Sequence, residues 1–209
     1  MKDLYTYIKE SISKVKFGDG IVVFDIDDTL LTSNSDIVRI IKHKPGEKPL
    51  VLSSDEYAKD PDVESHKEWF NFNDFRNPEK VLKSILTGTP KIKNLKILDD
   101  YVNAGYKFCF LTARGCEDVV KYAIQTFLKI RGTDGELRSL GLDFDKKNSH
   151  AINDANKNYK GSTDAERKAN ILNGLCDKFD KVVFVDDDIK NIKNAKSLNR
   201  ENLKIIKAW

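Results

Sequence analysis

Three short apolar runs in the chain each lead directly into a polar residue. The runs are Ile21 to Phe24, Lys107 to Leu111 and Val182 to Val185, and they are rich in β-branched and aromatic residues. Short, almost uninterrupted apolar runs of this kind are typical of strands that are buried on both faces of a parallel sheet. We therefore expect an α/β protein with a mainly parallel sheet flanked by helices.

Helical spacing of apolar residues separates the predicted strands. Apolar residues between Ile92 and Val102 recur on one helical face, and a second such pattern runs from Glu117 to Arg131. A third helix is expected after the capping sequence Ser162-Thr163-Asp164, and a fourth from Asp3 to Val15. The alternation of strands and helices supports the α/β class.

Residues 32–88 interrupt this regular pattern. Prolines punctuate the segment, and an aromatic cluster lies near its end, formed by Trp69, Phe70, Phe72 and Phe75. We expect one core built from residues 1–31 and 89–209, and a small insertion over residues 32–88. The aromatic cluster is expected to form a small core of its own, with stacking on a ligand as the alternative.

Composition restricts the class of protein only in part. The chain has 209 residues, of which 40% are hydrophobic and 33% charged, and its net charge is +3. These values indicate a globular protein, and a charge this small does not by itself imply a nucleic-acid partner. No apolar run reaches the roughly 20 residues of a membrane span, and the start of the chain has no signal-peptide pattern. We expect a soluble, cytoplasmic protein that does not contact the membrane. The histidines, His43, His66 and His150, are isolated and expected at the surface.

The polar residues that follow the three strands indicate a common site. Asp25 and Asp27 follow the first strand, Thr112 ends the second, and Asp186 and Asp187 end the third. Because ligands of open parallel sheets bind beyond the carboxyl ends of the strands, these residues are expected to meet there. A carboxylate nucleophile, an acid-base group and a hard cation such as Mg²⁺ are what phosphoryl transfer requires.

These residues resemble the four motifs of the haloacid-dehalogenase-like (HAD) superfamily of phosphohydrolases. The counterparts follow in order along most of the chain, as Asp25-Ile26-Asp27-Asp28-Thr29, Phe110-Leu111-Thr112-Ala113-Arg114, Lys168-Ala169-Asn170-Ile171-Leu172 and Val182 to Asn191. The resemblance implies a three-layer Rossmann-like HAD core, with residues 32–88 as a small cap inserted after the first motif.

The resemblance also implies a role for each residue. Asp25 is expected to form an aspartyl-phosphate, and Asp27 to protonate the leaving group and later activate water. Thr112 and Lys168 are expected to hold the phosphoryl oxygens, with Ala113 and Arg114 as further phosphate-binding candidates. Mg²⁺ is expected on Asp25, the backbone carbonyl of Asp27 and Asp186, with Asp187 assisting. Lys160 is an alternative to Lys168, and Arg114 suits a structural ion pair equally well.

The expected activity is therefore Mg²⁺-dependent hydrolysis of a phosphate monoester. The substrate is expected to be a nucleotide, another small organic phosphate or a nucleic-acid 3′-phosphate. The second and fourth motifs also resemble, more weakly, those of polynucleotide 3′-phosphatase domains. The alternative is a non-hydrolytic phospho-accepting or binding protein on the same fold, because a fold alone does not fix function. A signalling receiver domain is disfavoured because its paired acids come first and its lysine follows a late strand.

Overall fold

A parallel sheet of five strands forms the centre of the computed structural model, which describes residues 20–40, 49–63, 65–131 and 144–209. The strand order is β10-β9-β1-β7-β8, and every neighbouring pair is parallel. The strands are β1 (Gly20–Phe24), β7 (Lys107–Thr112), β8 (His150–Ala151), β9 (Lys181–Asp186) and β10 (Leu203–Lys207). The expected α/β class and the three predicted strands are confirmed, and these three are the central ones.

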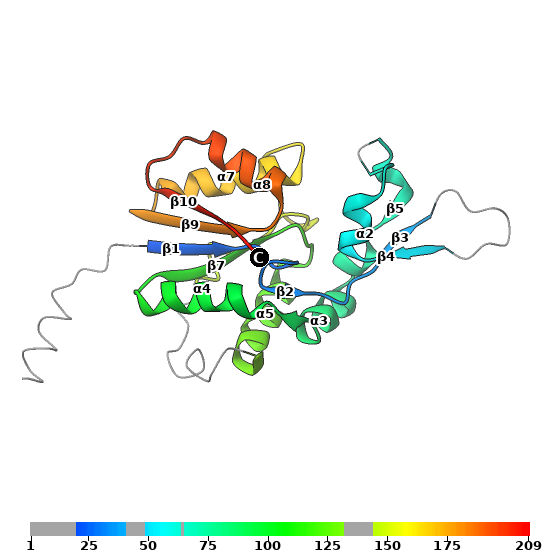
Figure 1. Ribbon diagram of the computed structural model, residues 1–209, viewed down its shortest axis with the longest axis horizontal. Coiled ribbons are helices and arrows are strands. Elements are labelled where there is room, and N and C mark those ends of the chain that lie inside the picture. Colours follow the sequence, from blue (N-terminus) through cyan, green and yellow to red (C-terminus); the bar gives the residue numbers. More distant parts are fainter. Residues whose placement is uncertain (1–19, 41–48, 64, 132–143) are drawn as a thin grey trace, which may run out of the picture.

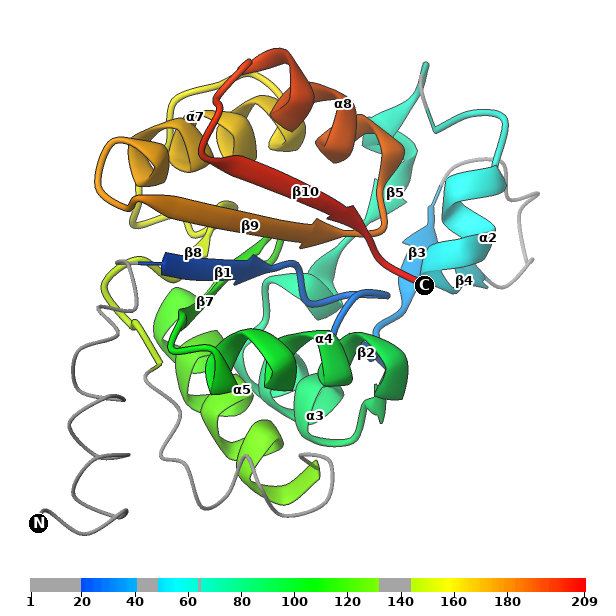
Figure 2. The same cartoon turned by 60° about the vertical axis from the view of Figure 1, so that its left-hand side comes forward.

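Helices cover both faces of this sheet (Figures 1 and 2). One face carries α4 (Ile92–Asn103) and α5 (Glu117–Arg131), and the other carries α7 (Asp164–Cys176) and α8 (Ile189–Ser197). The predicted cap of α7 is present, because the Thr163 side chain accepts a hydrogen bond from the backbone of Glu166. The helix predicted from Asp3 to Val15 lies outside the described residues.

Alternation along each central strand divides the core into two clusters. In β1, Val22 and Phe24 pack with α4 and α5, whereas Ile21 and Val23 pack with α7 and α8. Successive strand side chains point to opposite faces, so a strand with helices on both sides is apolar at every position. This explains why the strands read as continuous apolar runs in the sequence.

A small lobe lies beside this core (Figure 1). We use this name for the described residues between Ile37 and Phe75. They form an antiparallel sheet in the order β4-β3-β5, one helix and two single turns of 3₁₀-helix. The elements are β3 (Ile37–Arg39), β4 (Leu50–Leu52), α2 (Ser54–Lys59), η1 (Lys67–Trp69), β5 (Phe70–Asn71) and η2 (Asn73–Phe75).

The small lobe has its own apolar core. Ile37, Leu52 and Phe70 are buried in it, and the remaining aromatic residues of the predicted cluster, Trp69, Phe72 and Phe75, pack against them. The expectation that this cluster forms a core is confirmed.

Three further elements connect the small lobe to the sheet. Strand β2 (Leu31–Thr32) pairs antiparallel with β6 (Thr89–Pro90) where the chain leaves and re-enters the core. Helix α3 (Pro78–Leu86) buries Val81 and Ile85 in the same cluster as α4 and α5. The last part of the 32–88 segment is therefore continuous with the main core.

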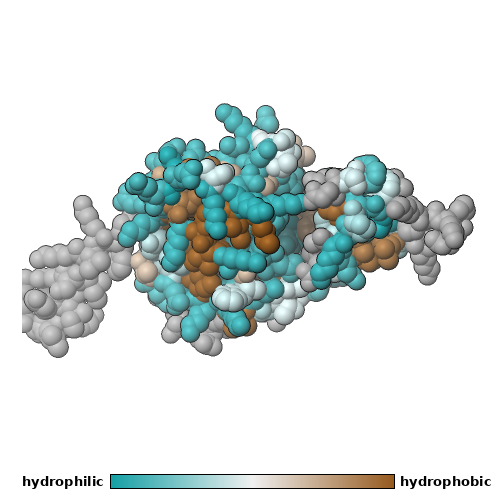
Figure 3. Space-filling model, turned by 45° about the horizontal axis from the view of Figure 1, so that its top comes forward, coloured by the Kyte–Doolittle hydropathy of each residue, from teal (hydrophilic) through white to brown (hydrophobic). Residues whose placement is uncertain are grey.

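Hydrophilic residues cover most of the face shown in Figure 3, and a patch of apolar residues interrupts them on the body of the core. Among the helices that the structure describes, none has the length and apolar character needed to cross a membrane.

Candidate active site

A tight turn after β1 presents the first group of acidic residues. The backbone N–H groups of Leu30 and Leu31 both donate to the carbonyl oxygen of Ile26, at 2.9 and 3.1 Å. Asp28 has a φ of 55°, in the left-handed region that Asp tolerates better than most residues. The chain thus reverses directly after Asp25, and both Asp25 and Asp27 line one cavity.

Three carboxylates from two neighbouring strands converge at this edge. Asp25, Asp186 and Asp187 each offer an oxygen atom, and these three atoms lie within 4.8 Å of one another. The register explains the convergence, because Phe24 of β1 pairs with Val185 of β9, and the next residue in each strand is an aspartate.

Lys168 of α7 lies between two of these carboxylates. Its Nζ atom is 2.9 Å from Asp25 Oδ1 and 2.8 Å from Asp186 Oδ2. Burial would lower the pKa of Lys168, but the two carboxylates outweigh it and raise this pKa, so the ammonium stays charged. Burial, opposed by Lys168, raises the pKa of Asp25 well above its usual value. Lys160, the alternative, is exposed, and its backbone carbonyl accepts a hydrogen bond from Asn170.

Asp186 and Asp187 also accept hydrogen bonds from neighbouring polar side chains. Asn191 of α8 donates to both carboxylate oxygens of Asp186, at 3.1 and 3.0 Å. The hydroxyl of Thr29 donates to Asp187 Oδ1 at 2.8 Å. Burial raises the pKa of Asp187 to about 6, against the lowering effect of the Thr29 hydroxyl. Asp187 therefore has a hydrogen-bond donor but, among the described residues, no cation.

The charge balance of this cluster fits a hard divalent cation. Three carboxylates face one ammonium group, which leaves two negative charges uncompensated when all are ionised. Carboxylate oxygens are the ligands that Mg²⁺ and similar ions prefer, and such an ion would relieve the repulsion between the acids. The residues that could hold it are Asp25, Asp186 and Asp187.

Asp27 lies apart from these three carboxylates and pairs with Arg114. The guanidinium donates to both carboxylate oxygens, from Nε at 2.8 Å and from Nη2 at 2.6 Å. It also donates to Ser84 and Ser35, both at 3.0 Å, and lies over the ring of Phe75. Arg114 is completely buried. A structural ion pair, one of the two roles expected for Arg114, is thus present.

The second predicted motif contributes one residue, Ala113, to the lining of the cavity. Ala113 lines the cavity, whereas Thr112 and Arg114 lie behind its surface. Thr112 is buried, and its hydroxyl lies 3.4 Å from the backbone nitrogen of Arg114. Access of a phosphoryl group to Thr112 therefore requires a local rearrangement.

The cavity lies between the core and the small lobe. Its volume is about 820 Å³, and its core side is lined by Asp25, Asp27, Lys168 and Asp187. Its lobe side includes Phe70 and aromatic neighbours. A polar site that faces an apolar wall across a cavity of this size is typical of sites for small organic molecules.

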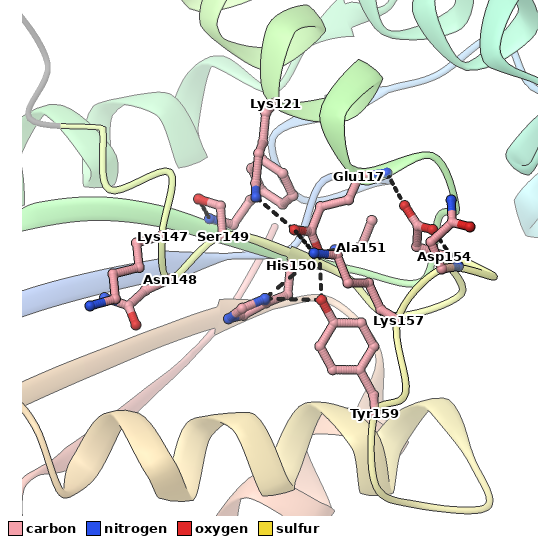
Figure 4. Close-up of polar contacts among 12 residues, drawn as sticks. Glu117, Lys121, Lys147, Asn148, Ser149, His150, Ala151, Asp154, Lys157 and Tyr159 are labelled. Carbon is pink, nitrogen blue, oxygen red and sulfur yellow. Dashed lines mark hydrogen bonds and ion pairs between the residues drawn. The ribbon is translucent and has the colours of Figure 1, made fainter.

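A second polar cluster supports the segment that leads to Lys168 (Figure 4). The Glu117 carboxylate accepts hydrogen bonds from Lys121 at 2.6 Å and from the hydroxyl of Tyr159, which also lies 3.0 Å from His150 Nδ1. Asp154 accepts a hydrogen bond of 2.6 Å from the Glu117 backbone N–H. The start of α5 is thereby fixed to the chain between β8 and α7.

The histidines do not all lie where the sequence suggested. His150 is half-buried in the cluster around Glu117, so the expectation of a surface position is wrong for it. His66 is partly exposed and stacks on Trp69. His43 lies outside the described residues.

Comparison with known proteins identifies the family. The model of a family described as "Protein of unknown function (DUF2608)" matches residues 1–175 of the chain. The chain belongs to the DUF2608 family. No curated protein and no solved structure matches the chain significantly. The part matched by the DUF2608 model includes Asp25, Asp27 and Lys168 but ends before Asp186 and Asp187.

Some residues of this DUF2608 site were not found from the sequence. Ser35 and Ser84 bind Arg114, Thr29 binds Asp187, and Asn153 donates to the Ala113 carbonyl at 2.7 Å. Thr29 belongs to the first motif, so its position was a usable signal. Ser35 and Asn153 lie in irregular stretches and Ser84 lies in α3, and in neither setting does a single polar residue carry a recognisable pattern.

Proposed function

We propose that this protein is an Mg²⁺-dependent phosphatase of the HAD type, which hydrolyses a phosphate monoester through an aspartyl-phosphate on Asp25. The observation that carries the proposal is the convergence of Asp25, Asp186 and Asp187 at the carboxyl edge of the sheet, with Lys168 in contact with Asp25 and Asp186. The order of the four motif-like segments along the chain supports the same reaction.

The first half of the reaction transfers the phosphoryl group to Asp25. A carboxylate oxygen of Asp25 attacks phosphorus, and the bond from phosphorus to the ester oxygen breaks. Asp27, in its protonated form, gives a proton to that leaving oxygen. The pair with Arg114 fixes the direction of the Asp27 carboxylate.

The second half returns the enzyme to its starting state. Asp27, now a carboxylate, takes a proton from a water molecule whose oxygen attacks phosphorus. The bond between phosphorus and Asp25 breaks, and orthophosphate leaves. Lys168 is charged when the reaction begins, because two carboxylates contact its Nζ atom, and it offsets the negative charge near Asp25.

A divalent cation held by Asp25, Asp186 and Asp187 would supply electrostatic stabilisation of the phosphoryl oxygens. The backbone carbonyl of Asp27 is a further proposed ligand. Thr112, Ala113 and Arg114 remain candidates for phosphate binding, and of these Ala113 lines the cavity.

We further propose that residues 32–88 act as a cap that selects the substrate. The small lobe supplies the wall of the cavity opposite the carboxylates, so it would contact whatever is attached to the phosphate. Nucleotides, other small organic phosphates and nucleic-acid 3′-ends are the candidate substrates.

The test is the release of orthophosphate from a panel of these phosphates, with Mg²⁺ and with a chelator. The proposal predicts release that requires the metal and disappears in Asp25→Asn, with Asp180→Asn, an exposed aspartate outside the site, as the matched control. Equal release by Asp25→Asn would rule out the proposed nucleophile. A folded, Mg²⁺-binding protein that releases nothing would favour the binding or phospho-accepting alternative.

A further inference from the structure

The cavity is much larger than a phosphoryl group requires. Its volume of about 820 Å³ lies within the range of sites that enclose a whole small organic molecule. Asp25 and Lys168 occupy only its core side, so the remaining lining contacts the rest of the substrate. The chemistry of that lining therefore indicates the class of substrate.

Aromatic rings form part of the lining on the lobe side. Tyr57, Phe72 and Phe75 all line the cavity and are half-buried. Tyr57 meets Phe72 edge to face, with centroids 5.2 Å apart, and Phe72 meets Phe75 at 6.3 Å. Partly exposed rings in this arrangement offer both faces and edges to a flat or apolar group.

Arg76 adds a positive charge to the same lining. Its side chain is exposed and has no hydrogen-bond or ion-pair partner within the described part of the chain. Its backbone is nevertheless fixed, because Cys116 Sγ donates to the Arg76 carbonyl at 2.9 Å and the Gly115 N–H donates to Phe75. The charge is thus presented to the cavity from a fixed backbone.

Arg167 lies on the adjoining part of the lining. Its Nη1 donates to Asn153 Oδ1 at 3.0 Å and to Asp164 at 3.1 Å. A Cβ atom added to Gly115 would lie 3.1 Å from the Asn153 carbonyl oxygen and 3.7 Å from Arg76 Cα. Gly115 therefore lies close to the backbones of both Asn153 and Arg76, and the two arginines line the same cavity, although Asp164 already offsets part of the charge of Arg167.

We infer that the substrate is an aromatic phosphate monoester with a second anionic group. The ring lies against Tyr57, Phe72 and Phe75, and the second anion, a carboxylate or a further phosphate, binds Arg76 with help from Arg167. Arginine suits both anions because its planar guanidinium binds two oxygens at once. This inference rests on the proposed function, which places the phosphate end of the substrate at Asp25.

The experiment compares ligands that differ only in the second anion. Turnover is measured with phenyl phosphate and 4-carboxyphenyl phosphate, and with adenosine 3′-phosphate and adenosine 3′,5′-bisphosphate. Binding is measured by calorimetry, in Mg²⁺, with benzylphosphonate and 4-carboxybenzylphosphonate, which cannot be hydrolysed. The proteins are the full chain, Arg76→Gln, and Arg200→Gln as a control that loses a partly buried arginine outside the cavity.

We expect the ligand with the second anion to bind about tenfold more tightly or better, as one charge-assisted contact allows. In Arg76→Gln this ratio falls toward one, whereas in Arg200→Gln it is unchanged. The ligand pair with the larger ratio of affinities shows whether the site prefers a carboxylate or a phosphate as the second anion.

Equal affinities for both members of every pair in the full chain, or a preference that survives in Arg76→Gln, would overturn the inference. The two proposals fail separately. Phosphonate binding that depends on Arg76 without any turnover would retain the anion site and reject the phosphatase. Turnover with no preference for the ligands that carry a second anion would retain the phosphatase and reject the anion site.

Discussion

Arg114 donates hydrogen bonds to both carboxylate oxygens of Asp27, at 2.8 and 2.6 Å. The same guanidinium binds Ser35 and Ser84, which belong to the 32–88 segment. The residue proposed as acid and base is therefore oriented by an arginine that is itself oriented by the proposed cap. A change in the position of the 32–88 segment would be transmitted to Asp27 through one buried side chain.

The first prediction concerns this pair. Arg114→Gln should lower kcat by about 100-fold, the lower end of what general acid-base catalysis contributes, because Asp27 loses its orientation. Phenyl phosphate should be affected more than 4-nitrophenyl phosphate, whose leaving group needs less protonation. Steady-state kinetics with both esters measures this.

Ser35→Ala is the matched control for that variant, since it removes one contact of Arg114 and leaves the pair with Asp27. Its effect on kcat should be much smaller than that of Arg114→Gln. A folded Arg114→Gln protein with unchanged kcat on both esters would show that the pair has no part in the reaction.

The second prediction separates the two candidate lysines. Lys168→Ala leaves Asp25 and Asp186 buried without their cation, and breaking a buried ion pair costs about 3–5 kcal/mol of stability. Activity should be lost as well. Lys160→Ala should change the free energy of unfolding by no more than about 0.5 kcal/mol, because the side chain is exposed. Denaturant unfolding and phosphate release test both variants, and the reverse order of effects would contradict the assignment.

The third prediction uses the raised pKa of Asp187. Its pKa is about 6 in the folded protein against 3.8 ordinarily, so the folded state binds more protons than the unfolded state between these values. The stability that depends on this group is therefore lost as pH rises from 3.8 to about 6. Without metal, the wild type should become less stable than Asp187→Asn across this interval, and the difference should then stay constant at higher pH.

Added Mg²⁺ should reverse the difference in stability between the wild type and Asp187→Asn. Above pH 6 the ion should raise the Tm of the wild type more than that of Asp187→Asn, because the variant has lost one carboxylate ligand. Thermal unfolding at several pH values, with Mg²⁺ and with chelator, provides the comparison. The prediction is wrong if Mg²⁺ stabilises both proteins equally.

Much of the fold was predictable because the central strands are buried on both faces. A strand such as Ile21 to Phe24 must be apolar at every position. The capping residues Thr163 and Glu166 indicate the start of α7. The polar residues at the strand ends were predictable for a related reason, since the carboxyl edge of a parallel sheet collects them. The meeting of Asp25 with Asp186 followed from this, whereas Lys168 of α7 was expected only from the resemblance to the HAD motifs.

The remaining features depend on contacts that have no local pattern. Strand β10 lies at the edge of the sheet, and its Lys204 and Lys207 are exposed, so it did not read as a buried strand. The small lobe is made of strands of two or three residues, which are too short to show periodicity. Arg114 pairs with Asp27 across 87 positions of sequence, and the sequence left its role open.

The central claim is that Asp25 carries the phosphoryl group, and trapping that group tests it most directly. Asp27→Asn, which lacks the base for the second half of the reaction, is mixed with Mg²⁺ and 4-nitrophenyl phosphate, quenched in acid and digested for mass spectrometry. The account predicts one phosphoryl group on Asp25, lost on treatment with hydroxylamine and absent when a chelator replaces Mg²⁺. Metal-dependent release of orthophosphate that continues in Asp25→Asn, with no phosphoryl group on the peptide that contains Asp25, would contradict it.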